Sequence, residues 1–112
     1  MNPDELYIRH IIDALAKVTE YTGVVHETFL KDSHWQDAII RQLEVVGEAT
    51  KRLSDELRFQ YPDVPWRRMA GLRDVLIHDY MGVDIEAVWV VASSLASEMR
   101  RRLMEILTEI RS

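Results

Sequence analysis

Apolar residues recur at helical spacing through most of the chain, and no segment alternates between apolar and polar residues with a period of two. The longest series lies in the last third of the sequence, at Ile85, Val88, Trp89, Ala92, Leu95, Met99, Leu103, Ile106 and Ile110. Two further series lie at Ile8, Ile11, Ile12, Leu15 and Val18 and at Trp35, Ile39, Leu43, Val46, Leu53 and Leu57. Because a strand buried on one face needs the period of two, these spacings predict an all-α fold.

Most of the glycines and prolines lie where the apolar pattern changes phase, so they mark the ends of the expected helices. These helices cover residues 3–22, 33–60, 65–82 and 85–111. Ser33 and Gln36, three residues apart, have the form of a capping box at the start of the second helix, whereas the stretch before them is poorly patterned. Long helices joined by short connections favour an up-and-down antiparallel bundle of four to five helices.

Size and composition narrow the class of protein. The chain has 112 residues, 47% of them hydrophobic, which suits one domain over residues 1–112. The net charge of -5 argues against a protein that coats nucleic acid or anionic membrane through its overall field. The lack of cysteine excludes disulfides and thiolate chemistry and fits a cytoplasmic location. Asp4 and Glu5 stand where a signal peptide would be basic, and the longest apolar run, residues 87–92, is too short to span a membrane.

Residues 73–82 combine side chains that phosphate chemistry uses. Arg73 offers a guanidinium fork, His78 can transfer a proton near neutral pH, and Tyr80 adds a phenol. Asp74 lies one helical turn before His78 and can orient its ring. On a regular helix Arg73 and His78 are about 140° apart, so one chain presents an incomplete site. From these residues alone, a structural histidine beside a surface arginine remains an alternative.

Other constellations give weaker signals. The sequence has no glycine-rich phosphate loop, HExxH motif or EF-hand loop, so we expect no metal site. We interpret His10, His26 and His34 as exposed or partly packed side chains. Arg41 and Glu48, seven residues apart and nearly on one helical face, form either an ion pair that supports the reactive segment or a structural salt bridge.

The pattern Arg73-x4-His78-x-Tyr80 is the part of the sequence that points to a known family. It resembles the R-x4-6-H signature of the HEPN superfamily, and its H-x-Y ending resembles the HepT-like toxin branch. The family often has Asn directly after the arginine, whereas this chain has Asp74. A carboxylate accepts hydrogen bonds but cannot donate them, so we expect different contacts with RNA at this position.

Three further blocks extend this resemblance in the same order. Residues 41–49 resemble the R-x-L-x-x-x-G-E-A stretch of the family, residues 62–66 its P-x-x-P-W stretch and residues 71–73 its G-x-R stretch. The bare arginine–histidine spacing recurs by chance, but four ordered blocks over about residues 35–90 make the resemblance specific.

The resemblance implies an all-helical bundle that forms a homodimer, with two copies of the motif facing each other across a cleft. It also implies metal-independent cleavage of RNA, with tRNA and mRNA as possible targets, and no cofactor of the chain's own. In that reaction His78 acts as general acid or base while the RNA 2'-hydroxyl attacks its own phosphate, and Arg73 stabilises the phosphorane, leaving a 2',3'-cyclic phosphate. Asp74 is a supporting residue, and Arg67 and Arg68 are candidates for contacting the RNA.

The same resemblance implies a partner that silences the chain. In toxin–antitoxin pairs of the type VII kind, a minimal nucleotidyltransferase uses ATP to adenylylate the tyrosine of the H-x-Y motif. Tyr80 matches that tyrosine, and its position two residues before Gly82 suggests an accessible hydroxyl at a helix end.

Two alternatives from other classes remain. The chain could be a non-catalytic helical subunit that dimerises and presents substrates to a nucleotidyltransferase. It could also be a helical interaction module in which Arg73 and His78 are structural. Toxicity of the overexpressed chain and the stability of variants at these two positions would discriminate among the three.

Overall fold

The computed structural model describes residues 3–72 and 85–111. Every regular element in these residues is helical, and none of them forms a strand, which confirms the all-α prediction. The elements are α1 (Pro3–Tyr21), α2 (His26–Lys31), α3 (Ser33–Lys51), α4 (Asp55–Gln60), α5 (Trp66–Ala70), α7 (Ile85–Val90), the π-helical turn η1 (Val91–Leu95) and α8 (Ala96–Arg111). No helix in the described part of the chain is long and apolar enough to cross a membrane.

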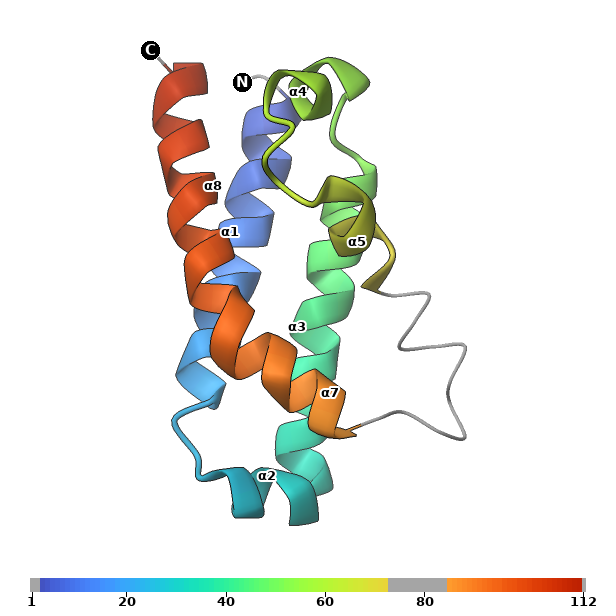
Figure 1. Ribbon diagram of the computed structural model, residues 1–112, viewed down its shortest axis with the longest axis vertical. Helices are drawn as coiled ribbons and strands as arrows, with labels where there is room; N and C mark the ends of the chain where they lie inside the picture. The colour runs from blue at the N-terminus through green and yellow to red at the C-terminus, as the bar shows by residue number, and fades with distance from the viewer. Residues whose placement is uncertain (1–2, 73–84, 112) are drawn as a thin grey trace.

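Three long helices make up the body of the fold. Figure 1 shows α1 running antiparallel to both α3 and α8, with α4 and α5 towards one end and α2 towards the other. Helix α1 packs against both α3 and α8, so its apolar face is covered from two sides. The predicted antiparallel bundle is therefore confirmed for these three helices.

The predicted apolar series supply the core. Ile8, Ile11, Leu15 and Val18 of α1 have no exposed surface, and the side chains of α3 and α8 that meet them are equally buried. These partners include Ile39, Leu43, Val46, Leu103 and Ile106. Burial of an aliphatic side chain contributes about 1.5–3 kcal/mol, so the packing of α1 against α3 and α8 stabilises the bundle.

The expected helix over residues 33–60 is broken in the structure. Helix α3 ends at Lys51, and α4 begins after Ser54, whose backbone is extended (φ -68°, ψ 152°). Ser54 Oγ accepts a hydrogen bond from the Leu57 backbone N–H, and Asp4 accepts from Ser54 N and Oγ at 2.9 and 2.6 Å. The prediction of one helix is wrong because Leu53 and Leu57 keep helical spacing across the break and are both buried.

We expect Ser54→Ala to lower the free energy of unfolding by about 1–2 kcal/mol, because it removes both the cap of α4 and a hydrogen bond to Asp4. Ser33→Ala is the matched control, since Ser33 is exposed and no hydrogen bond of its side chain occurs among the described residues. Urea unfolding at one protein concentration measures both. Equal losses in the two variants would contradict the assignment of Ser54 as the cap.

The connection between α1 and α3 also differs from expectation. Residues 26–31 have a poor apolar pattern and were not expected to form a helix. They form α2, which is anchored by the fully buried Phe29. The capping box predicted for Ser33 and Gln36 is wrong. Asp32 caps α3 by accepting from the His34 backbone N–H at 2.9 Å, and the Gln36 amide donates instead to the carbonyls of Phe29 and Leu30. Asp32, one residue before Ser33, takes the capping position because a carboxylate is an equally good cap.

The C-terminal helix is continuous over the described residues 85–111 but contains a wide turn. In η1 the backbone N–H of Ala96 donates to the carbonyl of Val91, five residues before it. This turn shifts the phase of the apolar series, so Ala96 is fully buried and Leu95, predicted to be in the core, is 47% exposed. The third predicted helix is seen in its first part as α5, and residues 73–82 lie outside the described residues.

Candidate functional site

The reactive segment predicted from the sequence lies outside the described residues. This applies to Arg73, Asp74, His78 and Tyr80. The structure describes the elements that lead into and out of this segment, which are α5 with the following residue Leu72, and α7. The surroundings of the segment are therefore built from the described residues on these elements and on α1, α3 and α8.

Helix α5 carries two cationic side chains shortly before Arg73. Arg67 and Arg68 are both exposed, and neither forms an ion pair or hydrogen bond through its side chain within residues 3–72 and 85–111. The helix itself is fixed by Trp66, which is buried and donates its indole N–H to the Tyr61 carbonyl at 2.9 Å. A buried anchor at the start of α5 thus presents two guanidiniums that have no partner among the described residues.

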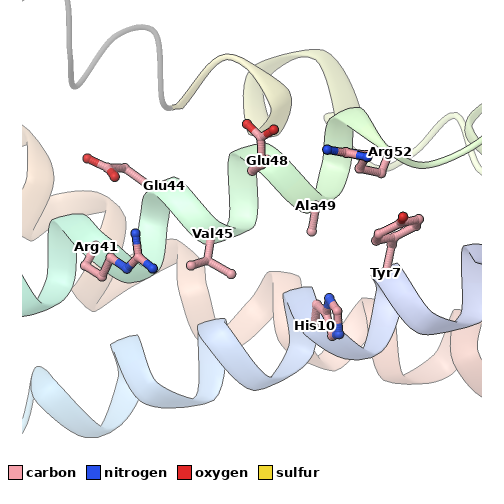
Figure 2. Close-up of a pocket in the computed structure, with 8 residues that line it drawn as sticks. All are labelled: Tyr7, His10, Arg41, Glu44, Val45, Glu48, Ala49 and Arg52. Carbon is pink, nitrogen blue, oxygen red and sulfur yellow. The ribbon is translucent and has the colours of Figure 1, made fainter.

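A charged groove lies between α1 and α3. It has a volume of about 610 Å³ and is lined by Tyr7, His10, Arg41, Glu44, Val45, Glu48, Ala49 and Arg52 (Figure 2). Figure 2 shows Glu44 and Glu48 on the side of α3 turned away from α1, and Val45 on the side that faces α1. The groove therefore presents both signs of charge, which does not favour a long run of phosphates.

Arg41 and Glu48 were predicted to support the reactive segment or to form a structural salt bridge. Both are exposed and line the same groove, and no ion pair joins these two described side chains. The sequence interpretation missed that Tyr7 and His10 of α1 complete this groove, with their rings edge to face at 6.1 Å. In the sequence, only the helical spacing of Arg41, Glu48 and their neighbours pointed to this groove. The contribution of α1 could not be seen there, because tertiary packing brings α1 to α3.

An aromatic cluster ties α2 to α7 just after the undescribed segment. The His26 ring stacks on Trp89 with centroids 5.0 Å apart, and His26 Nε2 lies 2.9 Å from Glu86 Oε2. The Phe29 ring also packs against Trp89, with ring centroids 4.9 Å apart. These contacts fix the start of α7 relative to α2. No group of three or more metal-ligating side chains occurs among the described residues.

A second polar network joins the loop after α4 to α8. Arg102 donates from Nε and Nη2 to the two carboxylate oxygens of Asp63 at 2.7 and 3.2 Å, and its guanidinium lies 5.5 Å from the centroid of the Tyr61 ring. The hydrogen bond from Arg102 lowers the pKa of Asp63, whereas a hydrogen bond with Glu109 and burial raise the pKa of Tyr61. At neutral pH Asp63 is therefore charged and Tyr61 neutral.

Comparison with protein families decides what kind of chain this is. Residues 11–106 match the family described as Ribonuclease HepT-like, which is part of the HEPN superfamily. The chain belongs to this HepT-like family. The matched region contains the motif from Arg73 to Tyr80, both helices that flank it and the whole of α3. The resemblance inferred from the four sequence blocks is thereby confirmed.

Individual relatives agree with the HepT-like assignment. A probable ribonuclease HepT of Thermococcus cleftensis is 42% identical over 84 residues, covering 74% of this chain and 76% of that protein. A protein of Methanocaldococcus jannaschii named as a predicted RNase is 36% identical over 105 residues, 93% of this chain and 87% of its own length.

One HepT-like relative is much longer than this chain. A second Methanocaldococcus jannaschii protein, named gamma-glutamylcyclotransferase and predicted RNase, is 34% identical over 107 residues. That alignment covers 95% of this chain but 48% of the relative, so the chain spans about half of that protein's length. No solved structure matches the chain.

Proposed function

We propose that the chain is a metal-independent endoribonuclease that cleaves RNA with Arg73 and His78. The observation that carries this proposal is the HepT-like family match over residues 11–106, which spans both side chains in their motif. The RNA 2'-hydroxyl attacks the adjacent phosphorus, a new bond to O2' forms, and the bond to the 5' oxygen breaks. His78 takes the 2' proton or delivers one to the leaving oxygen, and Arg73 stabilises the phosphorane charge.

Other residues support this chemistry. Asp74 would orient the His78 ring, as an acidic neighbour does for many catalytic histidines. Arg67 and Arg68 would contact the phosphates of the RNA, because both are exposed and unpaired within the described residues and lie five or six positions before Arg73. Arg41 and Glu48 of α3 would support the motif without touching the RNA.

The proposed active unit is a homodimer in which two copies of the motif share one cleft. A single chain separates Arg73 from His78 by about 140° on a regular helix, and a partner copy would supply the complementary group. Large apolar side chains are available for such an interface: Phe59 is 88% exposed and Val90 is 53% exposed. Isolated exposure of such residues is ordinary, so they are candidate contacts and the incomplete motif carries the proposal of a dimer.

The proposed regulation is adenylylation of Tyr80 by a minimal nucleotidyltransferase encoded nearby, in a toxin–antitoxin pair of the type VII kind. The tyrosine oxygen attacks the α-phosphorus of ATP, a phosphodiester forms, and pyrophosphate leaves. The product carries negative charge seven residues from Arg73 and adds the bulk of a nucleotide. Both would oppose the entry of RNA, because like charges repel and the cleft is filled.

Purified wild-type protein is expected to cleave a structured RNA, such as a tRNA transcript, in the presence of EDTA. Light scattering of the same sample is expected to give the mass of two chains. A complete lack of cleavage across tRNA and mRNA substrates, together with stable complex formation with the nucleotidyltransferase, would contradict the proposal. It would favour the alternative of a non-catalytic subunit that presents substrates.

A further inference from the structure

The second large hollow of the molecule lies between α5 and the C-terminal helix. This α5–α8 cleft has a volume of about 620 Å³, within the range of roughly 300–1,000 Å³ typical of small-molecule sites. Its walls are apolar, with Met69 and Leu72 on the α5 side and Leu95 and Met99 on the other. A hollow of this size with aliphatic walls can accept one flat heterocyclic ring.

The π-helical turn η1 shapes one wall of this cleft. A regular α-helix would keep Leu95 in phase with the buried series, but the wide turn buries Ala96 and leaves Leu95 47% exposed at the cleft. Single π-helical turns are rare, and they occur frequently at functional sites. The exposed leucine is thus a consequence of backbone geometry at this position, and it widens the apolar surface of the cleft.

Two guanidiniums stand at the cleft on opposite walls. Arg68 of α5 has no ion pair or hydrogen bond with any described side chain, and Arg101 of α8 is 69% exposed with a contact to Glu105 at 3.8 Å that is too long for a hydrogen bond. Exposed pairs of that kind contribute little, so Arg101 remains available to a ligand. Both side chains can reach an anionic group at the cleft.

The charge of the cleft contrasts with that of the chain. Three arginines and two carboxylates line it, for a formal charge of +1, against -5 for the whole sequence. One of the carboxylates, Asp63, is already neutralised by Arg102 at 2.7 Å. The other, Glu98, can accept a hydrogen bond from an exocyclic amine of a nucleobase. Apolar walls, two guanidiniums that a ligand can reach and one acceptor together match a nucleotide.

We infer that the α5–α8 cleft binds one unpaired nucleotide of single-stranded RNA, with the base between the aliphatic walls and its phosphates on Arg68 and Arg101. The inference rests on the proposed ribonuclease function. The cleft lining includes Leu72, the residue directly before Arg73 in the sequence. A nucleotide held in the cleft therefore contacts the residue at which the reactive segment begins. The cleft thereby selects RNA that has an unpaired base near the cleavage point.

The test uses the non-cleaving His78→Ala protein and a fluorescein-labelled single-stranded 12-nucleotide RNA of mixed sequence, with anisotropy as the readout. Arg68→Glu and Arg101→Glu are each expected to weaken binding about tenfold and to lower the salt slope by about 0.7. Lys17→Glu, the same charge change at an exposed site on α1 outside the cleft, is the matched control and should leave the slope unchanged.

The apolar part of the cleft is tested separately by Leu95→Ala, with Leu30→Ala on α2 as its control. Both leucines are partly exposed, at 47% and 38%, so both variants should keep their helical circular dichroism. Leu95→Ala is expected to weaken RNA binding several-fold at unchanged salt slope, because it removes apolar contact and no charge. Leu30→Ala should bind like the parent protein.

Several results would overturn this inference. Equal effects of Arg68→Glu and Lys17→Glu would show that Arg68 affects RNA binding only through the overall charge of the protein. Unchanged RNA binding by Leu95→Ala would exclude a base between the aliphatic walls. A change in oligomeric state with RNA binding intact would assign the cleft to a protein partner. If wild-type protein cleaves RNA while every cleft variant binds like the parent, the cleft inference fails and the proposed function stands. If the cleft variants lose binding but wild-type protein cleaves nothing, the proposed function fails instead.

Discussion

Replacing His78 with alanine is expected to lower the rate of RNA cleavage by about 10²–10⁴, the contribution typical of one general acid or base. RNA binding should be nearly unchanged, because Arg67, Arg68 and Arg73 supply the contacts with phosphate in this proposal. His34→Ala is the matched control, since His34 is exposed on α3 and its ring contacts only the neighbouring Trp35 among the described residues. The measurement is single-turnover cleavage at saturating protein.

A second substitution separates proton transfer from charge stabilisation. Arg73→Ala should lower cleavage by about 10²–10³, as loss of a transition-state donor does, and Arg73→Lys should recover part of the rate because it restores the charge without the fork. Urea unfolding of each variant excludes misfolding as the cause. Full activity of the His78→Ala protein with normal stability would assign the histidine a structural role.

Replacing Tyr80 with phenylalanine is expected to abolish adenylylation completely, because the acceptor oxygen is gone. Wild-type chain incubated with the neighbouring nucleotidyltransferase and ATP should gain the mass of one adenylyl group or a multiple of it. The matched control is Tyr21→Phe, whose half-buried ring packs against Trp35 at 6.1 Å and should not affect the modification. Intact-mass spectrometry gives the result for all three proteins.

The functional consequence of that modification can be read in the same samples. Adenylylated wild-type chain should lose RNA cleavage, whereas Tyr80→Phe should cleave RNA and resist inhibition by the transferase. Modification of Tyr80→Phe to the same extent as wild type would show that another residue is the acceptor. Cleavage that persists in fully adenylylated protein would contradict the proposed silencing, although not the nuclease itself.

The sequence predicted the helices well where the apolar period was long and uninterrupted. It did not reveal the break before Ser54, because Leu53 and Leu57 are buried at the spacing of a continuous helix. It also missed the π-turn, since one extra residue in a turn changes only the phase of Leu95 relative to Ala96. Both errors arise where local hydrogen bonds change the backbone conformation while the spacing of the apolar residues stays close to that of a regular helix.

The family could be predicted from the sequence because its signature lies in one segment, whereas the roles of the residues in that segment stay a prediction. The spacing of Arg73 and His78, with the blocks around them, was enough to point to the family. The grooves were not predictable, because each is assembled from segments that are distant in the sequence. His10 of α1 lines one groove together with residues of α3, and Arg68 of α5 lines the α5–α8 cleft together with Arg101 of α8. Such neighbours follow from tertiary packing, which one sequence does not specify residue by residue.

The most direct test of the central claim is the chemistry of the RNA ends produced in EDTA. Wild-type protein is expected to leave a 2',3'-cyclic phosphate and a 5'-hydroxyl, because the attacking oxygen belongs to the RNA itself. Mass spectrometry of the fragments, with His78→Ala as the parallel sample, identifies both ends. Fragments that carry a 5'-phosphate and a 3'-hydroxyl, or cleavage that requires added metal, would contradict the mechanism assigned to Arg73 and His78.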